Sequence, residues 1–313
     1  MQRESCQRGK HAPRAGIHEI RSVSFGPRLA DNGNANIDDQ EAPVQSKMKE
    51  SKTLLAGKTA LVTGSTGGLG RGIAEGLAAA GCNIVLHGLA ATSEGEDACA
   101  SIGDAYSVDV RYVRADLADP TAIESMVNDL HESGKRIDVL VNNAVVRHFA
   151  PVEAFPREAW DAALAVNVSA AFHLIRLTLP GMRARGWGRI FNMTSVYGSR
   201  GATNRIDYVT TKSALLGMTR AVAMETIGQG VTCNAVCPGT VLTPNIEMRV
   251  QALMDQRGVD RATATREFLA GKQPHADFID ARDIAALVVF LCGPASGDIT
   301  GAMLPMEGGW LAG

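Results

Sequence analysis

Residues 63–70 read Thr-Gly-Ser-Thr-Gly-Gly-Leu-Gly, and what stands on either side of this stretch decides the fold. An apolar run over residues 59–63 predicts a strand, and residues 71–80 have the apolar spacing of a helix. Glycines let a backbone turn tightly and approach a phosphate, whose charge the free N–H groups of a helix start attract. The stretch therefore predicts a dinucleotide-binding strand, turn and helix, although a purely structural turn would use the same residues.

The alternation of apolar strands and helices continues along the chain. Further strands are expected at 84–87, 110–114, 137–141, 188–194 and 230–236, and helices at 120–133, from 156 toward 183, at 207–228 and at 281–292. This order predicts an α/β fold, a single doubly wound parallel-sheet (Rossmann-like) domain over residues 53–313. Residues 242–275 interrupt it with two charged, amphipathic helices, which we interpret as a small helical substrate lid.

Residues 1–52 differ from the rest of the chain. They are rich in Arg, Ser, Gly, Asn and Gln and show no sustained hydrophobic period, which predicts a disordered N-terminal extension. Its first thirty residues are rich in Arg and poor in acids, as in organelle transit peptides. The alternative is that Met48 is the true start.

Composition restricts the class of partner. The 31 Lys and Arg residues nearly balance 33 Asp and Glu residues, so we expect no nucleic acid and no membrane as a partner but a small-molecule substrate. No stretch is expected to reach the roughly 18 apolar residues of a membrane span. The six cysteines form no Cys-x-x-Cys pair, which predicts no metal site and no disulfide framework and favours a cytoplasmic location.

Three residues late in the chain suggest proton transfer. Ser195 closes the strand at 188–194, and Tyr208 and Lys212 lie four apart at the start of a helix, hence on one face. An unperturbed tyrosine has a pKa of about 10. A neighbouring ammonium is expected to lower that pKa and make Tyr208 a workable acid and base, with Ser195 as a hydrogen-bond donor to the substrate oxygen. A core tyrosine and a solvated lysine would also explain the pair.

The order of motifs from about residue 55 to the end resembles the short-chain dehydrogenase/reductase family. The motifs are Thr63-Gly64 to Gly70, Ala115-Asp116-Leu117, Asn142-Asn143-Ala144, Asn167, Ser195, Tyr208 to Lys212, and Pro238-Gly239. The resemblance implies an oxidoreductase that transfers a hydride between a nicotinamide and a secondary alcohol or ketone. It implies a catalytic tetrad of Asn167, Ser195, Tyr208 and Lys212, with Asn167 anchoring a relay water.

The resemblance also implies where the cofactor binds. The expected cofactor-binding residues are Gly64, Thr66, Gly68, Leu69, Gly70, Leu89, Asp116, Leu117, Asn143, Ala144, Tyr208, Lys212, Pro238, Gly239, Val241 and Thr243. The second strand ends in His87-Gly88-Leu89 without an acid for a ribose, and no Arg or Lys stands at 65–66 or 87–90 to pair with a 2′-phosphate. We therefore expect NAD, and we interpret His87 as a solvent-facing histidine at a strand end.

One departure concerns the cofactor site, and others concern the substrate. Val145 stands where the family has a glycine. Within the family the chain is most similar to bacterial D-3-hydroxybutyrate dehydrogenases, which implies a small hydroxy acid such as 3-hydroxybutyrate, although Thr240 replaces a tryptophan and leaves room for a larger acid. The substrate-binding residues expected from this likeness are Arg147, Ser195, Tyr197, Arg205 and Gln273.

Other functions and assemblies stay open. A 3-oxoacyl thioester reductase that uses NADPH is a second enzyme hypothesis, against which the missing basic residues argue. A non-catalytic, dinucleotide-sensing regulator would be expected to have lost Tyr208 or Lys212. Small residues in the helices near 156–183 and 207–228, together with the resemblance, imply a homotetramer; burial of these helices against the sheet is the alternative.

Overall fold

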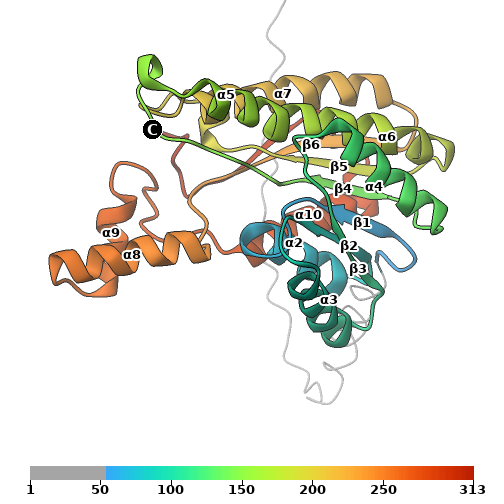
Figure 1. Cartoon of the computed structure of the whole chain (residues 1–313), viewed down its shortest axis with the longest axis horizontal. Coiled ribbons are helices and arrows are strands. Elements are labelled where there is room, and N and C mark those ends of the chain that lie inside the picture. The colour runs from blue at the N-terminus through green and yellow to red at the C-terminus, as the bar shows by residue number, and fades with distance from the viewer. Residues whose placement is uncertain (1–53) are drawn as a thin grey trace, which may run out of the picture. The chain divides into compact units, whose positions relative to one another are not determined.

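Seven short apolar segments lie side by side and pair as parallel strands in the computed structural model, which describes residues 54–313 (Figure 1). The expected extension at 1–52 lies outside the described residues. The strand order is β3-β2-β1-β4-β5-β6-β7, and it reverses between β1 and β4. The strands are β1 (Thr59–Val62), β2 (Asn83–Gly88), β3 (Val110–Arg114), β4 (Val139–Asn142), β5 (Gly188–Met193), β6 (Val231–Pro238) and β7 (Met303–Met306).

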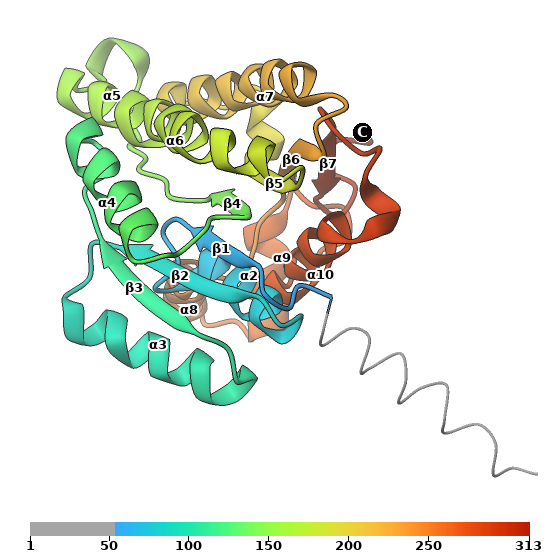
Figure 2. The ribbon, with the colours of Figure 1, turned by 90° about the vertical axis from the view of Figure 1, so that its right-hand side faces the viewer.

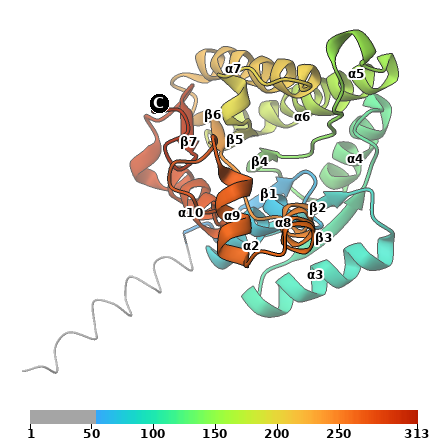
Figure 3. The same cartoon turned by 90° about the vertical axis from the view of Figure 1, so that its left-hand side faces the viewer.

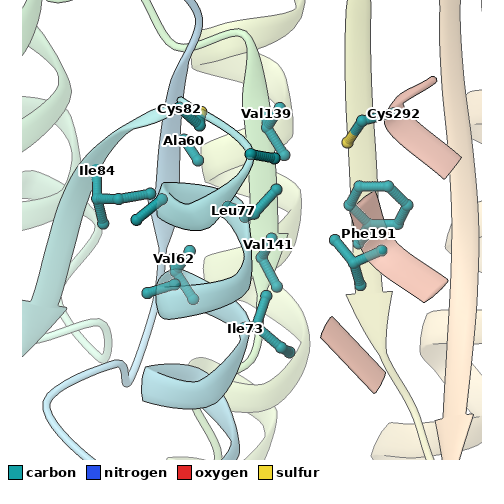
Figure 4. Close-up of a cluster of buried hydrophobic side chains, with 14 of the residues drawn as sticks. Ala60, Val62, Ile73, Leu77, Cys82, Ile84, Val139, Val141, Phe191 and Cys292 are labelled. Carbon is teal, nitrogen blue, oxygen red and sulfur yellow. The ribbon is translucent and has the colours of Figure 1, made fainter. Parts of the chain in front are cut away.

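The sheet is covered on both faces, so the residues of its central strands β1, β4 and β5 are buried. Successive side chains of a strand point to opposite faces. Ala60 and Val62 of β1 accordingly lie in one hydrophobic core and Leu61 in the other. Figure 4 shows part of the first core, where Val62 lies near Ile73 of the adjoining helix. Burial of a side chain such as Leu61 stabilises the fold by about 1.5–3 kcal/mol.

Helices cover both faces of the sheet. On one face lie α2, α3 and α10, and on the other α4, α6 and α7 (Figures 1 and 2). The helices are α2 (Gly68–Ala79), α3 (Thr92–Tyr106), α4 (Pro120–Glu132), α5 (Arg157–Leu164), α6 (Ala170–Ala184), α7 (Ile206–Thr226), α8 (Pro244–Arg257), α9 (Arg261–Leu269) and α10 (Ala281–Cys292). The doubly wound parallel sheet expected from the sequence is confirmed.

One helical stretch is more apolar than we expected. The helix Arg157–Ala184 is 28 residues long and contains an 18-residue window of mean hydropathy 1.5, enough by length and composition to cross a membrane. It contains no run of about 18 apolar residues, because Asn167, His173 and Arg176 interrupt it. Its apolar residues have another use, since Leu174, Ile175 and Met182 are buried in the core against the sheet.

Two elements were missed by the sequence analysis. Helix α3 contains two glycines and buries only Gly95, Ala98 and Ile102, so its apolar pattern is weak. Strand β7 is four residues long and contains Pro305, which a strand at a sheet edge tolerates because one side needs no ladder hydrogen bond. The two helices expected within 242–275 are present as α8 and α9.

Helices α8 and α9 form a small unit at the carboxyl end of the sheet. They project from the strands at the left of Figure 1 and face the viewer in Figure 3. Ile246, Val250 and Ala264 form a hydrophobic cluster of their own between them. The pair packs mainly on itself, and its role as a lid over the strand ends stays a prediction.

Candidate active site

A cleft of about 750 Å³ opens at the carboxyl ends of the strands. Its lining comes from the loops after β1, β2, β3, β4, β5 and β6 and from α7, α8 and α9. The reversal of strand order between β1 and β4 lies beside it, which is where ligands bind in open parallel sheets. Clefts of this size accommodate small ligands and cofactors.

The glycine-rich turn forms one wall of the cleft. Gly64 and Gly68 adopt φ values of +61° and +57°, a conformation that favours glycine. A Cβ built on Gly70 would overlap the carbonyl oxygen of Gly64 and would lie 2.5 Å from the side-chain nitrogen of Asn143. Gly70 therefore permits the close approach of the helix to the loop.

The start of α2 offers free donors to an anion. Its N-cap is Gly67, no side chain of the described residues caps the helix, and its first turn carries no acidic residue. The unsatisfied N–H groups and the positive end of the helix dipole therefore face the cleft without a competing carboxylate. The turn and the helix start fit the pyrophosphate of a dinucleotide.

His87 is a buried part of this wall. The expectation that it faces solvent is therefore wrong. Only 2% of His87 is exposed, its Nδ1 accepts a hydrogen bond from the backbone N–H of Gly64 at 3.2 Å, and its Nε2 lies 3.0 Å from the carbonyl oxygen of Ala115. These partners require a neutral ring with its proton on Nε2. Burial lowers the pKa of His87, which the hydrogen bond to Ala115 partly offsets.

Asn143 and Ser65 also hold the glycine turn in place. The Asn143 amide donates hydrogen bonds to the carbonyl oxygens of Thr63 at 2.9 Å and Gly64 at 3.0 Å. The Ser65 hydroxyl donates to the carbonyl of Val62 at 2.7 Å and accepts from the backbone N–H of His87 at 3.0 Å. The sequence analysis did not identify Ser65, because a serine within a glycine-rich turn gives no signal of its own.

Most residues expected to bind the cofactor line this one cleft. They are Gly64, Thr66, Leu69, Gly70, Leu89, Asp116, Leu117, Asn143, Ala144, Tyr208, Lys212, Pro238, Gly239, Val241 and Thr243. Gly68 is not part of the lining but begins α2. The side chain of Val145, at the position where the family has a glycine, also lines the cleft.

Ser195, Tyr208 and Lys212 converge on the floor of the cleft. Ser195 follows β5 and is 6% exposed, and the ammonium of Lys212 donates a hydrogen bond of 2.6 Å to the carbonyl oxygen of Met193. That ammonium lies 5.5 Å from the centre of the Tyr208 ring. The helix spacing thus brings the tyrosine and the lysine to one point, as the sequence predicts.

The pKa of Tyr208 differs from the expectation. Burial raises it above its usual value, and a hydrogen bond with Ser195 and the charges of Arg147 and Arg205 act in the opposite direction. The predicted lowering by Lys212 is therefore wrong, because loss of hydration of the phenolate outweighs the nearby cations. Burial also lowers the pKa of Lys212, to about 8.

Asn167 lies behind the cleft. It is 2% exposed and belongs to a π-helical segment, η3 (Ala165–Ser169), between α5 and α6. Its amide oxygen accepts from the N–H of Val146 at 2.9 Å, and its amide nitrogen donates to the carbonyl of Val146 at 2.9 Å. It thereby fixes the loop after β4, and its role with a relay water stays a prediction.

Four of the five expected substrate residues line the cleft and one does not. Arg147, Ser195, Tyr197 and Arg205 are in the lining. Gln273 is 3% exposed; its amide oxygen accepts from the N–H of Thr240, and its amide nitrogen donates to the carbonyl of Asp277 at 2.6 Å. Its polar groups therefore hold backbone at the edge of the lid instead of facing the cleft.

Arg205 is surrounded by aromatic rings. Its guanidinium carbon lies 4.2 Å from the ring centre of Phe149, 5.3 Å from that of Tyr197 and 5.5 Å from that of Tyr208. Burial lowers its pKa, and so does the charge of Arg147. The guanidinium thus lies near Tyr208, and no carboxylate of the described residues forms an ion pair with it.

Four further lining residues escaped the sequence analysis. Trp310 near the C-terminus packs edge-on against Tyr197 with ring centres 5.4 Å apart. Arg249 of α8, Phe268 of α9 and Lys272 after α9 come from the lid. These residues lie far from Tyr208 in the sequence, so no local pattern indicated that they share its cleft. An arginine on an amphipathic helix is also usually solvated.

Within residues 54–313, no cluster of three or more His, Cys, Asp or Glu side chains is placed to hold a metal ion. The site brings together the hydroxyl of Ser195, the phenol of Tyr208 and the ammonium of Lys212 beside the glycine-rich turn.

Comparison with known proteins agrees with this geometry. The family described as short chain dehydrogenase matches residues 58–253. The chain is 42% identical over 259 residues to a D-beta-hydroxybutyrate dehydrogenase of Cupriavidus necator, covering 83% of this chain and 100% of that protein. It is 39% identical over 255 residues to the protein of that name in Rhizobium meliloti, covering 82% and 99% of the two chains.

Solved structures give the same answer. The L-sorbose reductase of Gluconobacter frateurii, in complex with NADPH and L-sorbose, superposes with a TM-score of 0.79 at 30% identity, covering 84% of this chain and 99% of that one. Sequence, fold and the convergence of Ser195, Tyr208 and Lys212 therefore agree. The chain belongs to the short-chain dehydrogenase/reductase family of dinucleotide-dependent oxidoreductases.

Proposed function

We propose that this oxidoreductase interconverts a small hydroxy acid and the corresponding keto acid with NAD, and that 3-hydroxybutyrate and acetoacetate are the first pair to test. The observation that carries the proposal is the position of Arg147 and Arg205 in the lining beside Tyr208. Guanidinium groups bind carboxylates through paired, charge-assisted hydrogen bonds. The relatives named as D-beta-hydroxybutyrate dehydrogenases support the same substrate class.

In this proposal each residue of the site has a separate role in the reaction. When bound, the dinucleotide takes up or returns the two electrons of the oxidation. Ser195 donates a hydrogen bond to the substrate oxygen, and Tyr208 exchanges the proton of that oxygen. Lys212, fixed by its hydrogen bond to Met193, adds positive charge beneath the ring. Arg205 and Arg147 orient the acid so that its alcohol carbon faces these groups.

NAD is proposed because the adenine end of the cleft carries no basic lining within the described part of the chain. The residues there include Leu89, Asp116 and Leu117, and none is Arg or Lys. Arg114 lies outside the lining, and its Nε donates to the carbonyl of Leu89 at 3.3 Å. Asp116 would repel a 2′-phosphate. Titration of the protein with NADH and NADPH, followed by nicotinamide fluorescence, tests this choice, and tighter binding of NADPH would contradict it.

The substrate class is tested by comparing 3-hydroxybutyrate with its methyl ester, which has the same alcohol but no charge. We expect the acid to have a kcat/KM at least about tenfold higher, and Arg205→Met to remove most of the difference. Arg157→Met, an exposed position on α5, is the matched control. Equal use of the acid and its ester, or activity confined to uncharged alcohols, would refute the proposal.

Location and assembly are part of the same proposal. The cysteines at 82, 99, 233, 237 and 292 are free thiols, which supports a reducing cytoplasm. Phe172 on α6 and Met224 on α7 are 51% and 71% exposed, which supports association of these helices in a homotetramer. Light scattering of the purified protein tests the assembly, and a monomer would contradict it.

A further inference from the structure

The substrate end of the cleft contains four cationic side chains, more than are needed to bind one carboxylate. Arg147 follows β4, Arg205 precedes α7, Arg249 lies on α8 and Lys272 follows α9, and all four line the cleft. None of them forms an ion pair with a residue of 54–313. Other lid arginines do have partners, such as Arg261 with Glu247.

The four cations form two pairs. The inner pair, Arg147 and Arg205, lies beside the catalytic tyrosine, and the guanidinium of Arg205 is 5.5 Å from the Tyr208 ring centre. The outer pair, Arg249 and Lys272, converges on Phe268 of the lid. The Arg249 guanidinium carbon is 5.0 Å and the Lys272 ammonium 4.5 Å from the centre of that ring.

Among the described residues, aromatic rings, and no carboxylate in an ion pair, lie beside three of these cations, namely Arg205, Arg249 and Lys272. The Lys272 ammonium also donates a hydrogen bond of 2.9 Å to the carbonyl oxygen of Phe268, which fixes its position. Rings hold cations in place but leave their charge available to a ligand. Among residues 54–313, Asp116 is the single acidic residue of the cleft lining, and it belongs to the adenine end.

Cations that line the same cleft without a counter-charge repel one another. The pKa of Lys272 is lowered by burial and further by the charges of Arg249 and Arg205, so the outer pair and the inner pair lie within interaction range. One bound carboxylate offsets the repulsion within one pair only. A ligand with two anionic groups offsets it in both pairs.

We propose that the preferred substrate is a hydroxy dicarboxylate or its keto counterpart, an inference that depends on the hydroxy-acid function proposed above. The inner pair binds one carboxylate on the side of Tyr208, and the outer pair binds the second carboxylate at α8 and α9. In the oxidation the C–H and O–H bonds of the alcohol break and a C=O bond forms. The hydrogen of the C–H bond leaves with its electron pair to NAD⁺, and the alcohol proton passes to the phenolate form of Tyr208.

The test uses one alcohol with two carboxylates and two alcohols with one carboxylate. They are 3-hydroxyglutarate, its monomethyl ester and 3-hydroxybutyrate, with 3-hydroxybutyryl coenzyme A as a phosphate-bearing fourth. We expect the diacid 3-hydroxyglutarate to be oxidised with a kcat/KM about tenfold or more above the value for its monoester. In Arg249→Met and Lys272→Met this ratio of diacid to monoester should fall toward one, whereas Arg157→Met should keep it.

A binding measurement supports the kinetics independently of turnover. Glutarate should stabilise the protein with NADH against thermal unfolding at lower concentration than butyrate does, and Arg249→Met should remove the difference. Use of 3-hydroxybutyrate with no preference for the diacid over its monoester overturns the inference and leaves the proposed function standing. A preference for the coenzyme A ester also overturns the inference. If the protein oxidises uncharged alcohols but none of the acids, both the inference and the proposed function are overturned.

Discussion

The imidazole Nδ1 of His87 accepts a hydrogen bond from the backbone N–H of Gly64 at 3.2 Å, so the end of β2 holds the glycine-rich turn that follows β1. The other ring nitrogen, at 3.0 Å, binds the carbonyl oxygen of Ala115 at the end of β3. Three strand ends are thereby joined through one neutral ring. Protonation of that ring at Nδ1 would place two N–H donors, those of Gly64 and His87, against each other.

His87 makes folding stability depend on pH. Because burial lowers its folded-state pKa, the unfolded chain binds a proton before the folded protein does. The contribution of neutral His87 to folding stability is fully present above the pKa in the unfolded chain, about 6.5. It is lost as the pH falls through the lower pKa of the folded protein. We expect the free energy of unfolding in urea to decrease below pH 6.5 in the wild type.

His87→Gln is the matched variant, since a glutamine can accept and donate but does not titrate in this range. It should show less of the decrease between pH 6.5 and 5. His87→Ala should cost about 1–3 kcal/mol at pH 7.5, because two buried backbone groups lose their partner. Identical pH profiles for the wild type and His87→Gln would show that the ring does not titrate as described.

Gly70 is expected to be essential for the shape of the dinucleotide wall. In Gly70→Ala the new Cβ meets the Gly64 carbonyl and the Asn143 amide, so the turn must shift. We expect NADH affinity to fall by about tenfold or more and stability by about 1–3 kcal/mol. Fluorescence titration and urea unfolding measure the two effects.

Gly217→Ala is the control for this substitution. Gly217 lies within α7, and a Cβ there has nothing within 4 Å among the described residues. It should leave NADH affinity unchanged and should stabilise the helix by about 0.4–1 kcal/mol. An unaltered NADH affinity in Gly70→Ala would mean that the turn does not shape the cofactor site.

The two directions of the reaction should respond differently to pH. With its pKa raised, Tyr208 is a neutral phenol at neutral pH, ready to donate a proton to a ketone. Alcohol oxidation needs the phenolate, whose fraction grows about tenfold per pH unit below the pKa. We therefore expect kcat/KM for oxidation to rise from pH 7 to pH 9 and kcat/KM for reduction not to rise. A flat oxidation profile would indicate that another group takes the proton.

The sequence was sufficient for the fold and for the juxtaposition of Tyr208 and Lys212, because both depend on local patterns. The strand before the glycine turn, the turn itself and the spacing from Tyr208 to Lys212 each predict their own geometry. Strand β7 and helix α3 were missed because Pro305 and the glycines of α3 weaken the local signal.

Which distant residues meet could not be predicted from local patterns. His87 becomes buried only because the turn after β1 and the end of β3 close over it. Gln273 turns to the backbone of Thr240 and Asp277, although the resemblance implied a substrate contact. Arg249 and Lys272 reach the cleft only through the placement of α8 and α9. The sign of the Tyr208 pKa shift likewise depends on burial, which no spacing reveals.

The most direct measurement is turnover and NADH binding in Tyr208→Phe, with Tyr106→Phe at the exposed end of α3 as the control. The substitution removes one hydroxyl and keeps the ring between Arg205 and Lys212. We expect kcat to fall by about 10²–10⁴-fold while the dissociation constant for NADH stays within about twofold and the control behaves as the wild type. A Tyr208→Phe protein that keeps its turnover would contradict the assignment of proton transfer to this phenol.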